Sequence, residues 1–145
     1  MRHLAISGLL LTLAVAFAAA KDETMAEMKA RLDHAPPEDR PGICILIAEH
    51  QLRDADKLYT DGQVEQAQAE VEDVVTYSEK ARDSAYKANR HLKSVEITVR
   101  KMAEKLRDIK RTLAFDDQPP VDQAIKRLED IRTALLKEMF KKDKK

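Results

Sequence analysis

Few residues of this chain have the types and the spacing that metal or acid–base chemistry requires. His50 and Asp54 are four residues apart, so on a helix they would share one face and offer two ligands to a metal ion. Useful metal sites hold three or four ligands, and no Glu stands three residues before His34, His50 or His91, as the Glu-x-x-His pattern of di-iron bundles requires. We therefore expect His50 and Asp54 to form a solvated or capping pair.

A haem site would need a different set of ligands. Noncovalent haem in a helical bundle is bound by His and Met side chains, and the residues that could supply them are His91, Met25, Met28 and Met102. Methionines at helical spacing usually fill a hydrophobic core instead. We therefore predict that the chain holds no metal and no cofactor, and we keep a small periplasmic metal- or haem-binding helical bundle as the alternative function.

Motifs of the common enzyme classes are missing. The glycines that follow the first twenty residues are Gly42 and Gly62, too few for a Gly-rich phosphate loop, a dinucleotide fingerprint or a nucleophile elbow. The adjacent carboxylates at 72–73 and 116–117 are expected on the solvated side of a helix and at a helix end, where general acid–base roles have little support. The sequence thus predicts a noncatalytic protein.

Cys44 is the only cysteine, so no disulfide can form within the chain. It stands in an apolar segment, residues 43–47, that is typical of a core. We favour a buried, inert thiol, because free cysteine is among the most buried residue types. An intermolecular disulfide or a reactive thiol is the alternative.

The first twenty residues have the layout of a secretory signal peptide. Arg2 precedes an apolar run over residues 4–17, and three alanines at 18–20 offer an A-x-A cleavage site before Lys21. The apolar run is short for a membrane span. We predict cleavage after Ala20 and an exported protein, periplasmic or extracellular, with no integral membrane segment after cleavage.

Charge is balanced overall but unevenly distributed. Residues 21–75 hold 14 acidic and 6 basic residues, a net of −8, whereas residues 87–111 hold 9 basic and 3 acidic residues, a net of +6. Segments of opposite sign can pair within one molecule or between two. The balanced total and the lack of Trp give no reason to expect a nucleic-acid partner.

Prolines and glycines divide the chain into four stretches with helical periodicity. The expected helices cover residues 22–34, 42–59, 63–113 and about 120–140. The first opens on Thr24-x-x-Glu27, a capping box. The predicted organisation is a signal peptide (1–20), a short helix with a Pro-rich loop (21–41), a helical coiled-coil-like domain (42–140) and a basic tail (141–145).

Residues 63–113 contain neither Gly nor Pro and carry the strongest structural signal. Fifteen positions recur there at strict 4-3 spacing and all but Ser78 are apolar: 64, 67, 71, 74, 78, 81, 85, 88, 92, 95, 99, 102, 106, 109 and 113. The pattern predicts one unbroken helix with coiled-coil-like packing. The alternative is a helix that breaks near its small-residue centre, so that a compact bundle forms.

The predicted fold class is all-α, an antiparallel helical bundle or coiled coil built on one long central helix (about 63–113) with shorter helices folded back at each end. At 1.5 Å per residue the long helix would span about 75 Å and the two shorter ones together about 60 Å, leaving a stretch near the centre uncovered. Ala81, Ala85 and Ala88 lie there. We therefore predict a self-association patch at these residues and a salt-sensitive antiparallel dimer.

The pattern Ala55-x-x-Leu58-x-x-x-Gly62-x-x-x-x-Ala67-x-x-x-Val71-x-x-Val74 resembles one tetratricopeptide-type helical hairpin, with small residues and a turn glycine in comparable places. The resemblance covers about twenty residues of one unit. It implies close packing of the helix over 42–59 on the start of the next helix, and no peptide-binding groove.

These observations predict an exported, noncatalytic helical interaction or scaffolding protein. Its expected partner is another protein or a second copy of the chain.

Overall fold

The computed structural model describes residues 22–142 of the chain, and within them the only regular structure is helical. The predicted signal peptide and the last three residues of the predicted tail lie outside this range. The elements are α1 (Met25–His34), α2 (Arg40–Thr60), α3 (Val64–Ala88), α4 (Leu92–Thr112), a short 3-10 helix η1 (Phe115–Asp117) and α5 (Gln118–Lys142).

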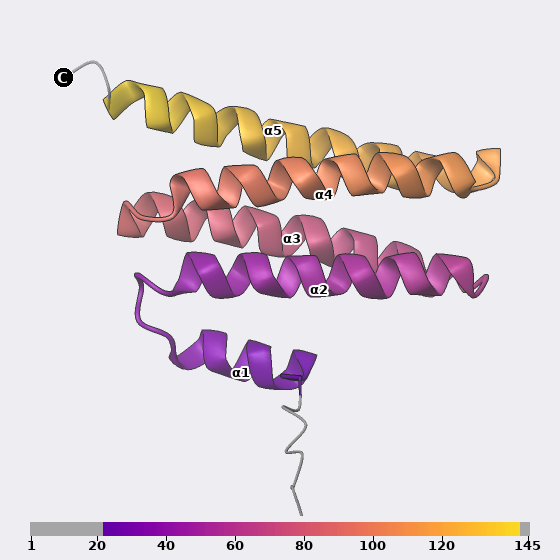
Figure 1. The fold of residues 1–145 in the computed structure, drawn as a ribbon, viewed down its shortest axis with the longest axis horizontal. Helices are drawn as coiled ribbons and strands as arrows, with labels where there is room; N and C mark the ends of the chain where they lie inside the picture. The colour runs from indigo at the N-terminus through magenta and orange to yellow at the C-terminus, as the bar shows by residue number, and fades with distance from the viewer. Residues whose placement is uncertain (1–21, 143–145) are drawn as a thin grey trace, which may run out of the picture.

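The five α-helices pack against each other, as predicted for an all-α protein. Figure 1 shows α2, α3, α4 and α5 lying side by side, each reversing the direction of the one before it, with short connections at alternate ends. These four helices have 21, 25, 21 and 25 residues, so each spans about 30–40 Å. The shorter α1 lies along the outer side of α2 (Figure 1).

The prediction of one unbroken helix over residues 63–113 is wrong. The helix ends at Ala88, and α4 begins at Leu92 and runs back beside α3 and α5 (Figure 1). The alternative, a break near the small-residue centre and a compact bundle, describes the observed arrangement. The helices are therefore similar in length, and α2 and α5 do not flank one long central helix.

The break needs neither Gly nor Pro because Asn89 and His91 both adopt the left-handed conformation, with φ of 52° and 64°. Asn and His enter this region more readily than most residues with a side chain. The Arg90 N–H donates to the carbonyl of Ala85, and the Asn89 N–H donates to that of Tyr86. This is the hydrogen-bond pattern of a Schellman motif, which ends a helix while satisfying its last carbonyls.

The 4-3 stripe forms the core even though two helices share it. Its members between Ala67 and Ile109 are buried, apart from Ala88, which is half-buried. Ser78, the one polar member, is fully buried and donates a 2.7 Å hydrogen bond to the carbonyl of Val74, which satisfies its hydroxyl. The stripe of α5 faces the same core through Val121, Ala124, Leu128, Ile131 and Leu135.

Two local predictions are confirmed. Thr24 and Glu27 form the capping box, with both reciprocal hydrogen bonds at 3.2 Å. The α2–α3 hairpin turns at Gly62, whose φ of 76° favours glycine, and its helices pack closely because Ala55 and Ala67 are fully buried.

The α1 helix has a small hydrophobic cluster of its own. Met28 is buried against Ile43 and Ile47 of α2, and Tyr77 of α3 packs at the edge of this cluster. The main core draws its buried side chains from α2, α3, α4 and α5, and Leu32 of α1 packs against it only partly buried.

Candidate functional site: a cleft beside α1 and the α3–α4 turn

A cleft of about 530 Å³ opens at the end of the bundle where the α1–α2 connection meets the α3–α4 turn. Its apolar lining includes Pro36, Ile43 and Leu46, and its polar lining includes His34 and His91. The volume lies within the range of about 300–1,000 Å³ that is common for ligand sites in proteins. The cleft lining therefore combines apolar side chains with two imidazoles and the carboxylate of Asp39.

Three separate elements position these residues. His34 is the last residue of α1, Leu46 lies in the second turn of α2, and His91 stands in the turn that ends α3. Leu46 is 38% exposed and lines the cleft. The left-handed backbone of His91 places its side chain at the cleft wall. An uninterrupted helix would not bring residue 91 there.

Arg31 also lines the cleft, but its charge is already engaged. Its guanidinium pairs with both carboxylate oxygens of Glu23 at 2.9 and 2.7 Å. This bidentate pair lies within the α1 segment and orders the residues that precede the helix.

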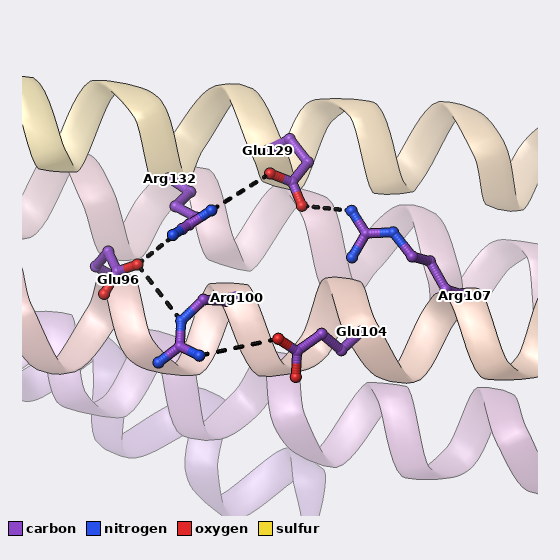
Figure 2. Close-up of polar contacts among 6 residues, drawn as sticks. All are labelled: Glu96, Arg100, Glu104, Arg107, Glu129 and Arg132. Carbon is purple, nitrogen blue, oxygen red and sulfur yellow. Dashed lines mark hydrogen bonds and ion pairs between the residues drawn. The ribbon is translucent and has the colours of Figure 1, made fainter.

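A chain of ion pairs crosses the α4–α5 seam on the flank of the bundle. Figure 2 shows its six members: Glu104, Arg100, Glu96, Arg132, Glu129 and Arg107. Arg132 lies 2.8 Å from Glu96, and Arg107 lies 2.6 Å from Glu129. Three carboxylates and three guanidinium groups thus neutralise each other on this face.

Other pairs connect the remaining helices of the bundle. Arg127 of α5 donates hydrogen bonds to Glu72 and Glu79 of α3, and these bonds raise the pKa of its guanidinium. Lys105 of α4 lies 2.8 Å from Asp56 of α2. In the part of the chain that the structure describes, the Lys105–Asp56 pair therefore joins the basic segment (87–111) to the acidic segment (21–75) within one molecule.

The predicted self-association patch does not form a free surface. Ala81 and Ala85 are fully buried in the core of a single chain, and Ala88 is half-buried. Because α4 folds back on the bundle, the helices of the same chain cover the centre that a dimer was expected to cover. Self-association itself stays a prediction, and the structure removes the exposed alanines that motivated it.

The candidate metal ligands do not form a complete metal site in residues 22–142. His50 Nδ1 lies 3.6 Å from Asp54, too far for a hydrogen bond. Among residues 22–142, no three His, Cys, Asp or Glu side chains are grouped closely enough to hold a metal ion. Met102 is buried in the core eleven residues beyond His91, or about 16 Å along a helix, which is too far for one iron. Met28 fills the α1 cluster.

Cys44 is buried, as predicted, with 2% of its surface exposed. Burial raises the pKa of its thiol, and the nearby charges of Lys80 and Arg40 offset only part of this rise. A protonated, enclosed thiol reacts slowly. Leu32 of α1 lines the same surface depression as Cys44.

Two functional features were missing from the sequence-based prediction. The ring of Tyr77 in α3 makes cation–π contacts with the ammonium groups of Lys80, 4.6 Å away, and Lys29, 5.6 Å away. Because Lys29 belongs to α1, its contact connects α1 to α3. His34 and His91 meet at one cleft although 57 residues separate them in the sequence. Neither has a motif, because both depend on how the helices pack.

None of the helices in residues 22–142 combines the length and the apolar character that a membrane span requires. Comparisons of the chain with protein-family models, curated proteins and solved structures find no match.

Proposed function

We propose that the chain is an exported, noncatalytic helical interaction protein. It binds a protein partner or a second copy of itself at the end of the bundle where α1, α2 and the α3–α4 turn meet. Export rests on the pattern of residues 1–20, with cleavage after Ala20 and a periplasmic or extracellular location.

The observation that carries this proposal is the contrast between two surfaces. The flank formed by α4 and α5 is covered by ion pairs that neutralise each other within the chain. At the cleft, apolar side chains such as Leu46 are exposed beside two imidazoles. A mostly apolar lining with a few polar groups is the usual composition of a recognition site.

Binding fits the cleft better than catalysis does. Within residues 22–142, neither His34 nor His91 lies within 4.0 Å of a carboxylate that would orient it as a general base. The cleft lining also supplies no serine, threonine or cysteine that such a base could activate. Apolar contact is what the site can offer.

A photo-crosslinking amino acid at position 46 tests the interaction in cells that export the protein. The matched control is position 104, because Glu104 is exposed on the ion-paired flank of α4. We expect defined adducts from position 46 and none from position 104. An absence of adducts from position 46, or equal adducts from both positions, would overturn the proposed site.

Export has its own test. We expect N-terminal sequencing of the purified protein to begin at Lys21, and fractionation to recover it outside the cytoplasm. Recovery of an uncleaved, membrane-embedded form as the main species would refute the proposal.

A further inference from the structure

We propose that α1 is an exchangeable helix, which leaves its site on α2 and α3 and binds the same site of a second copy. We call this site, formed by Ile43, Ile47 and Tyr77, the α1 seat. The inference rests on the proposed role as an interaction protein and names its partner, but it uses the α1 seat and not the cleft. The two subunits would exchange identical segments, which makes the interface symmetric.

The first argument is that the body of the protein does not need α1. Every buried side chain of the main core comes from α2, α3, α4 or α5. The only buried residue of α1 is Met28, and it belongs to the separate cluster on Ile43 and Ile47. The four longer helices therefore keep the main core when α1 moves away, although Ile43 and Ile47 lose their cover. The α1 helix itself loses the packing of Met28 and of the partly buried Met25 and Leu32.

The second argument is that α1 needs a partner surface. It has ten residues, and helices shorter than about 12–15 residues are marginal in water by themselves. Its capping box and the Arg31–Glu23 pair lie entirely within residues 23–31, so they stay intact when the segment moves. A released α1 thus keeps its local contacts and can bind an α1 seat. A second copy of the chain has an identical α1 seat.

Electrostatic contacts of Lys29 favour one orientation of α1 on the α1 seat of either copy. Lys29 lies over the ring of Tyr77 at 5.6 Å. It also faces Glu70 of α3, where it offsets part of the rise in pKa that burial, Asp54 and Asp73 cause at that carboxyl. A cation of α1 therefore meets an aromatic ring and an acidic region at the seat.

The connection between α1 and α2 can act as the hinge. Residues 35–39 can extend over at most about 17 Å, and Pro36 and Pro37 favour extended backbone. The observed bend is held by local contacts: Asp39 N–H to the Pro36 carbonyl at 3.1 Å and Arg40 Nε to the Ala35 carbonyl at 3.2 Å. Straightening the hinge loses these contacts and no buried side chain.

Exchange should then depend on protein concentration. The α1 contacts are the same in the monomer and in the exchanged dimer, so they cancel in the free-energy difference. What remains is the conformation of the hinge and the cost of bringing two chains together. A change in hinge length is therefore the most direct way to shift the equilibrium.

Hinge length is the first experimental variable, tested in the full mature chain by light scattering. We expect deletion of residues 37–38 to keep α1 from reaching its own seat, and so to give a dimer at concentrations at which the native chain is a monomer. Inserting six Gly/Ser residues after Pro37 should give a monomer. Neither change alters a buried residue. A monomer from the deletion variant would overturn the exchange.

Cys44 provides a second measurement, because it is buried beside a surface depression that Leu32 of α1 also lines, and release of α1 removes that wall. In the native chain, Met28→Ala should increase the rate of Cys44 labelling by a thiol reagent at least about tenfold. The matched control is Met139→Ala, because Met139 packs against the main core from α5, which Figure 1 shows on the opposite side of the bundle from α1. Equal labelling rates in the two variants would overturn the proposed release of α1.

Mixing two differently labelled preparations of the protein tests whether the partner is a second copy of the chain. Light and isotope-labelled chains, incubated together at high concentration and examined by native mass spectrometry, should form mixed dimers at the rate of Cys44 labelling. If position 46 crosslinks to another protein while the deletion variant stays monomeric, the interaction function stands and the exchange fails. If the deletion variant dimerises and position 46 gives no adduct, the exchange stands and the cleft proposal fails.

Discussion

Arg132 of α5 donates a 2.8 Å hydrogen bond to Glu96 of α4, a carboxylate whose side chain is only 9% exposed. A nearly buried carboxylate is costly unless it is paired, and Arg100 adds a second, weaker partner at 3.7 Å. Because Glu96 lies in the first turns of α4 and Arg132 in the later turns of α5, their pairing favours one register between two antiparallel helices.

Removing the guanidinium from this pair should destabilise the bundle. We expect Arg132→Met to lower the free energy of unfolding, because Glu96 would keep its charge without its closest partner. The matched control is Arg111→Met, since Arg111 pairs with Asp108 on an exposed surface and should change stability by less than about 0.5 kcal/mol. Urea denaturation measures both, and equal midpoints would contradict the role assigned to the pair.

The shared core predicts a large effect at Leu106, which is fully buried. Leu106→Ala should cost about 2–5 kcal/mol by loss of burial and creation of a cavity. Lys101→Ala on the exposed side of α4 should cost less than about 0.5 kcal/mol. Similar losses in thermal unfolding of these two variants would show that the assigned helix face is wrong.

A substitution at Ala85 tests whether this residue is a core position or a dimer contact. Because Ala85 is fully buried within one chain, Ala85→Glu should destabilise the folded monomer by about 3–5 kcal/mol through an unpaired buried charge. Circular dichroism during denaturation measures this loss. A fully stable Ala85→Glu variant that only changes its association in light scattering would restore the original patch.

Replacing Glu70 should stabilise the protein by an amount that depends on pH. Burial first, and then the charges of Asp54 and Asp73, raise its pKa above the ordinary value of 4.5. The folded state then binds a proton more readily than the unfolded state, so this group reduces stability as pH rises through the raised pKa. Glu70→Gln should therefore stabilise the protein at pH 7, and the difference should disappear below about pH 4.5. A constant difference across this range, measured by urea denaturation, would contradict the assignment.

The α3–α4 turn predicts a preference for glycine at position 89. Asn89 has a φ of 52°, so Asn89→Gly should leave stability unchanged or raise it slightly. Asn89→Val should cost at least about 1 kcal/mol, because a β-branched side chain is strained in this region. Thermal unfolding of the two variants provides the comparison, and equal stability would mean that the turn is not formed as described.

Local structure was predictable where neighbouring residues decide it. Thr24 and Glu27 satisfy each other's backbone groups within one helical turn, so their capping box could be predicted from spacing alone. The 4-3 stripe likewise identified the buried faces, because burial of a helix face depends on periodicity. Cys44 was correctly expected to be buried because its neighbours are apolar.

The path of the chain was decided by tertiary packing. Nothing local forbids a helix through Asn89 and His91, since neither residue is a strong helix breaker. A helix that continued through them would leave its small-residue centre exposed, whereas with the reversal Ala81 and Ala85 are fully buried in the main core. The free energy of that burial depends on residues distant in sequence.

The sequence by itself determined the helical class, the buried faces and the first helix cap, because each depends on residues within a few positions of one another. Only the tertiary structure decided the reversal at Asn89, the pairing of Glu96 with Arg132, and the meeting of His34 with His91. These features depend on which helices become neighbours, and that choice is made by the total apolar surface and charge that the whole chain can bury and pair.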